Sequence, residues 1–443
     1  MKLFNDHLWG VALLGFACVC PVYGQIPLSL EQAISLAHKH DPWLEGSHHR
    51  EQALTARGIA VGELPDPRVS LGLANLPVDS LEFDQEPMTQ FRVGVSQTFP
   101  RGDSQALQRR QLEQLRDQQP HMRRDREATI RLEVTQLWLE SYRHREAIRL
   151  IDRDRALFEH LADVAEASYT SALGQTSQQD LVRAQLELTR LDDRLAVLQS
   201  RREAARAQLS EWVITRSLEG FTISDALPDL SLVLPELLSE QGGEDPRLRQ
   251  LLLTHPRIQA IDQKIVASST SIDLARQKYK PQWDLNANYG YRDNDPVGRD
   301  RSDFLSVGVS FDLPLFTTNR QHKEVDAATA SAAAAKTERA LALRSMRAGF
   351  KAAKSRLLRL SQRKTLYENR LLREIHDQAE ASLMAYTHDA GDFAEVVRAR
   401  IAELNAHIEL LNIDIERLKT IAELNYFLVA GRDGQKKGQG HEN

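Results

Sequence analysis

The feature of this sequence that most constrains its fold is an internal duplication at a nearly constant offset. Four landmarks of the first half recur 214 residues later in the second half. The pairs are Asp41-Pro42 with His255-Pro256, Pro67 with Pro281, Gly94 with Gly308, and Pro100 with Pro314. The surrounding sequence agrees, because Val93-Gly-Val-Ser96 recurs as Val307-Gly-Val-Ser310. A repeat of this length predicts two copies of one structural unit rather than unrelated domains.

The duplication also sets the predicted boundaries. We expect a first structural repeat over residues 25–216, an inter-repeat linker over 217–245 and a second structural repeat over 246–430. The linker is rich in Gly, Pro, Ser and Asp, which predicts a surface segment with short structure. Residues 431–443 contain few apolar side chains and are predicted to be a disordered tail.

The start of the chain is typical of an export signal. Lys2 gives a positive start, residues 8–19 form an apolar run, and Val22 and Gly24 are small residues suited to cleavage before Gln25. We therefore predict a signal peptide over residues 1–24. The protein is then expected outside the cytoplasm.

Both cysteines of the chain, Cys18 and Cys20, lie in this signal. Cleavage would leave the mature chain without a thiol for disulfides, metal sites or catalysis. A lipoprotein signal acylated at Cys18 is the alternative. Gly15 and Phe16 fit the usual pattern before such a cysteine poorly, so we favour the cleaved signal.

Composition and motifs exclude several classes of function. A net charge of −5, with both signs interspersed, gives no basic surface for nucleic acid. No stretch of about 20 apolar residues follows the signal, so no membrane-spanning helix is expected. No phosphate-binding loop, nucleophile elbow or zinc motif occurs, so we predict neither an enzyme nor a cofactor. The histidines at 38, 40, 48 and 49 lack acidic or thiol partners and are interpreted as exposed polar residues rather than a metal site.

Each copy contains two segments in which apolar and polar residues alternate, which is typical of strands. The predicted strands cover about 67–76 and 89–99 in the first copy and 282–291 and 304–313 in the second. About 10 residues is the length that a tilted strand needs to cross a bilayer. Four strands cannot close a barrel, and an open edge in lipid leaves backbone groups unsatisfied, so we expect several protomers to share one barrel. The alternative is a pair of soluble hairpins packed on helices.

The remaining segments have helical periodicity. Ser29 and Gln32 have the spacing of a capping box, which predicts a helix start. Helices over about 104–171 and 318–388 would each extend about 100 Å. Pro120 in the first is a candidate kink or break. Coiled-coil seams are predicted at Leu181, Ala184, Leu188, Leu191, Leu195 and Leu198, at Met346, Phe350, Ala353, Leu357 and Leu360, and at Val397, Ile401, Leu404, Ile408, Leu411, Ile415 and Leu418.

With these features, the mature chain resembles the TolC-type outer-membrane efflux factor family over essentially its whole length. The residues that carry the resemblance are Leu30-Glu-Gln-Ala33 through Asp41-Pro42, the two strand pairs, and Tyr169 to Gly174 and Tyr386 to Gly391, each followed by Val-Arg-Ala. Leu64-Pro-Asp-Pro67, Leu71-Gly-Leu-Ala-Asn-Leu-Pro77, Met88-Thr89 and Val93 to Pro100 are more similar to its heavy-metal branch, the outer partners of cation-exporting resistance-nodulation-division pumps.

The resemblance implies a mixed α+β membrane protein with a duplicated helix-strand-strand-long helix-helix repeat. Each chain would contribute four strands to a shared transmembrane β-barrel and long helices to a periplasmic α-helical coiled-coil barrel. It implies a homotrimer in the outer membrane lipid of a Gram-negative bacterium, with a large periplasmic portion. Its implied partners are a periplasmic adaptor (membrane fusion) protein and an inner-membrane resistance-nodulation-division pump.

The function that follows is passive conduction of substrate, heavy-metal cations on the branch resemblance, from the pump and adaptor to the exterior. An outer-membrane factor for drug efflux or type I protein secretion is the first alternative. A periplasmic coiled-coil structural protein that forms no channel is the second.

Residues at two turns are candidates for the periplasmic tip. The resemblance places adaptor contacts at Tyr169, Gly174, Tyr386 and Gly391. Beyond these turns, Asp180 with Arg183 and Glu395 with Arg398 share an acid-x-x-Arg spacing that makes each pair neighbours on a helix. We interpret the two pairs as candidate pore gates, with ordinary solvated pairs as the alternative.

Overall fold

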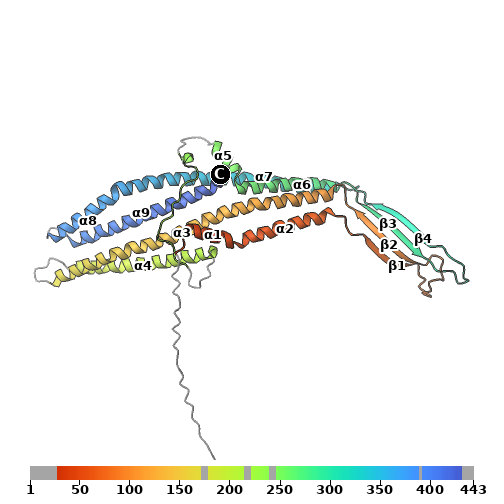
Figure 1. Ribbon diagram of the computed structural model, residues 1–443, viewed down its shortest axis with the longest axis horizontal. Helices are drawn as coiled ribbons and strands as arrows, with labels where there is room; N and C mark the ends of the chain where they lie inside the picture. The colour runs from red at the N-terminus through yellow and green to blue at the C-terminus, as the bar shows by residue number, and fades with distance from the viewer. Residues whose placement is uncertain (1–26, 171–177, 214–220, 239–245, 389–391, 432–443) are drawn as a thin grey trace, which may run out of the picture.

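The fold is an elongated bundle of helices with a four-stranded sheet at one end (Figure 1). It was obtained as a computed structural model, which describes residues 27–170, 178–213, 221–238, 246–388 and 392–431. The predicted signal peptide, Cys18, and residues 432–443 of the predicted tail lie outside the described residues. The sheet occupies one end of the long axis, and the hairpins α3–α4 and α8–α9 reach the other (Figure 1).

The same order of elements occurs twice along the chain. The first half contains α1 (Leu30–His40), α2 (Pro42–Gly62), β1 (Arg68–Ala74), β2 (Gln90–Phe99), α3 (Ser104–Thr170) and α4 (Gln178–Trp212). The second half contains a 3-10 helix (Pro235–Leu238), α5 (Pro246–Leu253), α6 (Pro256–Gln277), β3 (Trp283–Tyr291), β4 (Phe304–Phe311), α7 (Gln321–Leu366), a π-helix (Tyr367–Leu371), α8 (Leu372–Thr387) and α9 (Phe393–Phe427). The strands overlap the predicted ranges and differ from them by up to two residues at their ends.

The duplicated Asp-Pro and His-Pro landmarks are helix starts. Asp41 caps α2, where its Oδ1 accepts a hydrogen bond from the Trp43 backbone N–H at 2.8 Å. His255 caps α6, where its Nδ1 accepts from the Arg257 N–H at 3.2 Å. In both, proline occupies the first helical position, which needs no N–H donor. The predicted capping box at Ser29 is also present at the start of α1.

The four strands form one antiparallel sheet in the order β1-β2-β3-β4. Its centre joins the two halves of the chain, because β2 pairs with β3 from Phe91 opposite Tyr291 to Phe99 opposite Trp283. The outer strands, β1 and β4, each have one hydrogen-bonded neighbour within the chain. Both edges of the sheet therefore carry unpaired backbone donors and acceptors.

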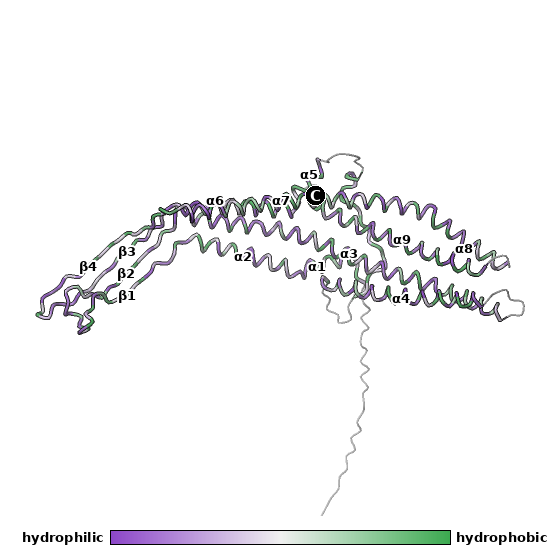
Figure 2. The backbone as a smooth tube through the Cα atoms, turned by 180° about the vertical axis from the view of Figure 1, so that it is seen from behind, coloured by the Kyte–Doolittle hydropathy of each residue, from purple (hydrophilic) through white to green (hydrophobic). Residues whose placement is uncertain are grey.

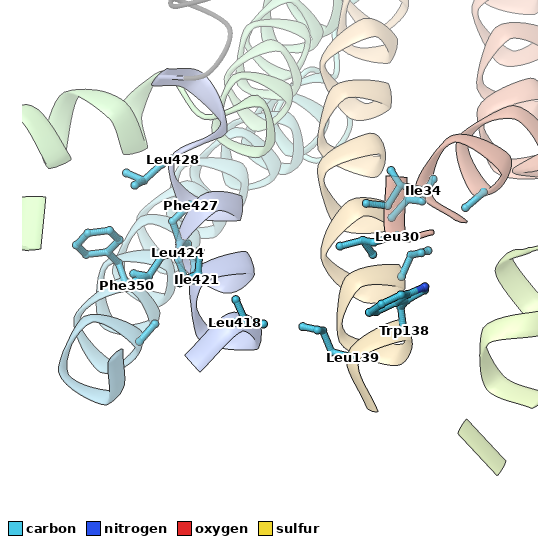
Figure 3. Packing of buried hydrophobic residues seen from close by; sticks show 14 of the residues in the cluster. Leu30, Ile34, Trp138, Leu139, Phe350, Leu418, Ile421, Leu424, Phe427 and Leu428 are labelled. Atoms are coloured by element: carbon cyan, nitrogen blue, oxygen red, sulfur yellow. The ribbon is translucent and has the colours of Figure 1, made fainter. Parts of the chain in front are cut away.

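The main core lies in the middle of the molecule (Figure 3). On one side, Trp138 and Leu139 of α3 pack near Leu30 and Ile34 of α1, and all four are at most 3% exposed. The Trp138 indole N–H donates to the Leu28 carbonyl oxygen at 3.0 Å, so the indole is buried without losing its hydrogen bond. On the other side, α9 packs on α7 through the predicted seam at 346–360.

A second core joins α3, α4 and α9 farther from the sheet. It contains Phe158 and Leu161 of α3, Leu191 and Leu195 of α4, and Leu404 of α9. These residues recur every three or four positions, as the predicted coiled-coil seams require. Two hydrophobic cores along one axis explain how so elongated a chain holds its helices in register.

The structure corrects two expectations. The helix α3 continues through Pro120 from Ser104 to Thr170, held there by α2 through the 3.0 Å hydrogen bond from Ser47 to the buried Gln119. The interruption lies instead in the second half, where the π-helix separates α7 from α8 by inserting an extra residue into the turn. The linker is also not simply a surface segment, since Phe221 and Leu237 are buried in the main core.

Candidate functional site

One face of the sheet is apolar and is left uncovered by the rest of the chain. The exposed fractions of Leu71, Leu305 and Val307 are 69%, 74% and 67%. The register places the apolar residues of all four strands side by side, for example Val69 opposite Val95. The apolar residues of the face are Val69, Leu71, Leu73, Phe91, Val93, Val95, Phe99, Trp283, Leu285, Ala287, Tyr289, Tyr291, Leu305, Val307, Val309 and Phe311, and the polar Gln97 lies among them opposite Leu285.

The alternative of soluble hairpins packed on the chain's own helices is therefore wrong. A water-soluble monomer rarely exposes so large a contiguous apolar surface. The face needs an apolar environment that this chain does not itself supply.

Aromatic residues gather at the two ends of this face. At the inner end, next to the helices, Trp283 packs on Phe311 with ring centroids 4.7 Å apart, and Phe99 lies opposite Trp283. At the outer end, Tyr291 lies opposite Phe91 and stacks on Phe83 at 6.3 Å. Eight residue steps along β3 separate these ends, or about 26 Å at the rise of a strand. Two aromatic girdles around an apolar band of this height are typical of strands that cross a bilayer.

The opposite face of the sheet is polar and closely packed. It carries serines, asparagines and glycines, with Gly94 lying between Ser70 and Asn288 of the neighbouring strands. A Cβ atom at Gly94 would overlap the Asn288 amide oxygen and the Ser70 hydroxyl. The absence of a side chain at Gly94 therefore leaves room for the Asn288 amide and the Ser70 hydroxyl on the polar face.

At the other end of the molecule, the described tip residues come from two hairpins. Tyr169 is exposed near the end of α3, and Tyr386 near the end of α8 packs edge-on against Phe393 at 5.5 Å. Gly174 and Gly391 lie outside the described residues. Figure 1 places both hairpins at the same end, so Tyr169 near the end of α3 and Tyr386 near the end of α8 share one end of the structure.

The second acid-x-x-Arg pair forms in the structure. Arg398 Nη2 lies 2.8 Å from Glu395 Oε1 in the first turns of α9, and both side chains are more than half exposed. Asp180 and Arg183 lie one turn apart at the start of α4 and are partly exposed. The geometry is that of exposed intrahelical neighbours, which stabilise a helix by only about 0.2–0.5 kcal/mol.

A charge network around the largely buried Arg400, beside the tip, was missed from the sequence. Arg400 of α9, whose side chain is 10% exposed, pairs with Glu380 of α8 at 2.7 Å and with Glu403 at 2.8 Å. His376 Nδ1 of α8 lies 2.6 Å from Glu403 Oε1. The network joins α8 to α9 through charged groups that are partly removed from water. The Arg400 to Glu403 spacing could have been noticed, but nothing local links it to residues 376 and 380.

The pKa values reflect this network. Burial alone would raise the pKa of Glu403, but hydrogen bonds from His376 and Arg400 outweigh it and the pKa is lowered. The hydrogen bond to Glu403 raises the pKa of His376. The lowered pKa keeps Glu403 ionised at neutral pH.

The four histidines considered as a metal site have separate surroundings. His38 Nε2 lies 3.0 Å from the Glu127 carbonyl oxygen, and His49 lies 3.8 Å from Glu45, while His40 and His48 are exposed. In the described part of the chain, no three metal-ligating side chains come together.

Hydrophilic and hydrophobic residues intermingle along the long helices (Figure 2). Among the helices that the structure describes, none is both long and apolar enough to cross a membrane.

Comparisons with known proteins are consistent with this arrangement of a four-stranded sheet and long helices. The family model for outer membrane efflux proteins matches residues 248–428. No curated protein matches the chain in sequence. In structure, the chain is similar to CusC, with a TM-score of 0.73 at 15% identity, covering 91% of this chain and 92% of CusC.

Two further channels give the same result. The CmeC outer membrane channel of Campylobacter jejuni has a TM-score of 0.72 at 14% identity, covering 92% of this chain and 88% of CmeC. The open MtrE outer membrane channel of Neisseria gonorrhoeae has a TM-score of 0.70 at 16% identity, covering 90% and 88%. The chain has the fold of these outer membrane channels.

The two faces of β4 give a direct test of which one meets lipid. We expect Val307→Arg to reduce membrane-assembled protein strongly, because an arginine facing lipid near the middle of a bilayer costs about 2–4 kcal/mol. Ser306→Arg, one residue away on the polar face, is the matched control and should assemble nearly as the wild type does. Quantitative extraction of membrane fractions measures both. Equal tolerance of the two arginines would contradict this assignment of faces.

Proposed function

We propose that this chain is an outer membrane efflux protein, the outer-membrane channel component of a tripartite efflux pump. The observation that carries the proposal is the sheet, which has an uncovered apolar face, a polar face and two unpaired edges. In lipid every backbone donor and acceptor needs a partner, so the edges must pair with those of other chains. The family match over residues 248–428 and the fold of the similar channels support the same conclusion.

The number of chains in the proposed barrel comes from the family resemblance. Each chain supplies four strands, and the smallest membrane barrels have about eight, so closure needs further chains but does not choose among two, three or four. A homotrimer with twelve strands is the proposed assembly because the family resemblance implies it.

The helical part fits a position in the periplasm. The 67 residues of α3 extend about 100 Å at the rise of an α-helix. With the sheet in the outer membrane, the two hairpins would reach toward the inner membrane. There they would meet a periplasmic adaptor and, through it, an inner-membrane resistance-nodulation-division pump.

Assembly and conduction test the proposal together. We expect the protein to require detergent for extraction, to have the mass of a trimer, and to give ion-conducting channels in planar bilayers. The need for detergent follows from the uncovered apolar face, and oligomerisation follows from edge strands whose backbone groups only other chains can pair. The number three and the conducting pore follow from the family resemblance. A water-soluble monomer after signal removal would contradict it and would favour the alternative of a periplasmic structural protein.

The cargo that we propose is a heavy-metal cation, on the similarity of residues 64–67 and 71–77 to the heavy-metal branch. Deletion of the protein should then increase sensitivity to a monovalent or divalent heavy metal. Growth in graded metal concentrations measures this, with plasmid-borne protein restoring tolerance as the control. Unchanged metal tolerance with new sensitivity to dyes or detergents would assign the protein to drug efflux instead, and loss of a secreted polypeptide to type I secretion.

We further propose that the two acid-x-x-Arg pairs close the tip. Such pairs stabilise a helix only slightly, so helix stability alone explains poorly why the same spacing occurs in both repeats. A trimer would bring three copies of each pair near the axis, where opposite charges on neighbouring chains could hold the tips together. An adaptor would open the tip by offering competing contacts.

Removing both acids should weaken such a latch. We expect Asp180→Ala with Glu395→Ala to raise single-channel conductance, and high salt to imitate part of the effect by screening. Asp273→Ala is the matched control, because Asp273 pairs with Arg276 at 3.0 Å with similar exposure but lies on α6, away from the tip. Wild-type conductance from intact double-mutant trimers would show that the pairs have no role in closing the tip.

A further inference from the structure

The polar face of the sheet carries few charges, and they are unevenly distributed. In the four described strands this face has three charged residues, Arg68, Arg92 and Asp284. Asp284 lies one position from the inner end and Arg68, opposite Ser96, three positions from it, and the two have opposite signs. Arg92 lies alone toward the outer end, where the same row across the sheet reads Gly72, Arg92, Gly290 and Phe304.

The small neighbours of Arg92 leave its side chain exposed on the polar face. Glycines flank it on both sides, since Gly72 and Gly290 are its partners in β1 and β3. Its Nε donates to Gln90 Oε1 at 3.1 Å. Gln90 is itself buried at 3% exposure, and a Cβ atom at Gly290 would overlap its amide oxygen. The glycine therefore makes room for the amide that accepts from Arg92, and Arg92 itself is exposed.

Arg292 is a second positive charge beside Arg92, whereas the loops beyond them are acidic: residues 75–89 contain four acids and no Lys or Arg, and residues 292–303 contain four acids and three arginines. The Arg292 guanidinium lies 3.9 Å from the centre of the Phe304 ring and donates to the carbonyl oxygens of Ser302 and Pro87. The nearest acid, Asp303, accepts from the Arg292 backbone N–H and from the Tyr289 hydroxyl, whose ring belongs to the apolar face. No carboxylate of the described strands lies in the Arg92 row.

We infer that Arg92 shifts the ion selectivity of the pore toward anions, as a ring of guanidinium groups in the outer part of the barrel, inside the acidic loops. The inference rests on the proposed function, because closure of the barrel is what turns the polar face into a lumen and one arginine into a ring. An exported metal cation would cross this ring against its charge. The ring therefore also slows the entry of free cations from outside.

The dimensions allow a single ring to act across the lumen. Twelve strands about 4.8 Å apart and tilted by about 40° enclose a backbone radius of about 12 Å. The arginine side chains point inward from that radius, so the axis lies within a Debye length of about 10 Å at 0.1 M salt. Three like charges at this distance change the local ratio of cations to anions by about two- to fivefold.

Reversal potentials in a potassium chloride gradient test the inference on the full-length oligomer in planar bilayers. Arg92→Gln should raise the ratio of potassium to chloride permeability about two- to fivefold. Arg92→Lys, which keeps the charge, should leave the ratio unchanged. Arg299→Gln is the control for loss of a charge at the outer surface, since Arg299 pairs with Asp295 in the loop and is mostly exposed.

A second variant makes the test independent of how the glutamine variant folds. Both cysteines of the chain lie within residues 1–24, so Arg92→Cys would give the mature channel one thiol per protomer. A cationic methanethiosulfonate reagent added to open channels should return the ratio to the wild-type value, and an anionic one should move it further away.

The outcomes separate the inference from the function on which it rests. Conducting wild-type and Arg92→Gln channels with equal permeability ratios would overturn the role of Arg92 and leave the channel intact. Thiol reagents without effect on conducting Arg92→Cys channels would do the same. A wild-type protein that forms no channel would instead overturn the proposed function, and the inference with it.

Discussion

The unpaired backbone edges of the sheet are the constraint on which the rest of this structure depends. In water, β1 and β4 could leave their outer donors and acceptors to solvent, but the apolar face beside them excludes water. In lipid, each unpaired group costs several kcal/mol, and only pairing with another chain removes that cost. Oligomerisation is therefore a condition for placing this sheet in a membrane rather than an addition to a finished fold.

The pairing at the centre of the sheet also fixes how the helices leave it. The strands β2 and β3 pair at the centre of the sheet, so the two halves of the chain leave it side by side and α3 packs along α6. The halves diverge toward the tip, where the π-helix at 367–371 and the buried Arg400 network belong to the second half alone. Because the ion pairs of Arg400 join α8 to α9 and the π-helix lies only in the second hairpin, we expect the two hairpins to respond differently to an adaptor.

Much of the fold could be predicted from the sequence because its signals are local and periodic. Alternation at residues 283–291 identifies a strand, and the capping box at Ser29 identifies the start of α1. The features that could not be predicted depend on contacts between distant residues. Phe221 is buried because α3 and α4 form a site for it, and the importance of Arg92 appears only when the register places Gly72 and Gly290 beside it.

Symmetry makes single residues unequal in their effect on such a channel. The apolar face tolerates variation among apolar side chains, because lipid needs only apolar area and no particular contact. On the polar face, a charge introduced once in the chain becomes a ring, and its field adds at the axis rather than averaging out. A wall of serine, asparagine and glycine binds solutes weakly, so discrimination must come from the few charged rows and from the partners that load the tunnel. A channel of this kind can therefore change its selectivity by one substitution at a position like Arg92 while its fold, its edges and its membrane surface stay the same.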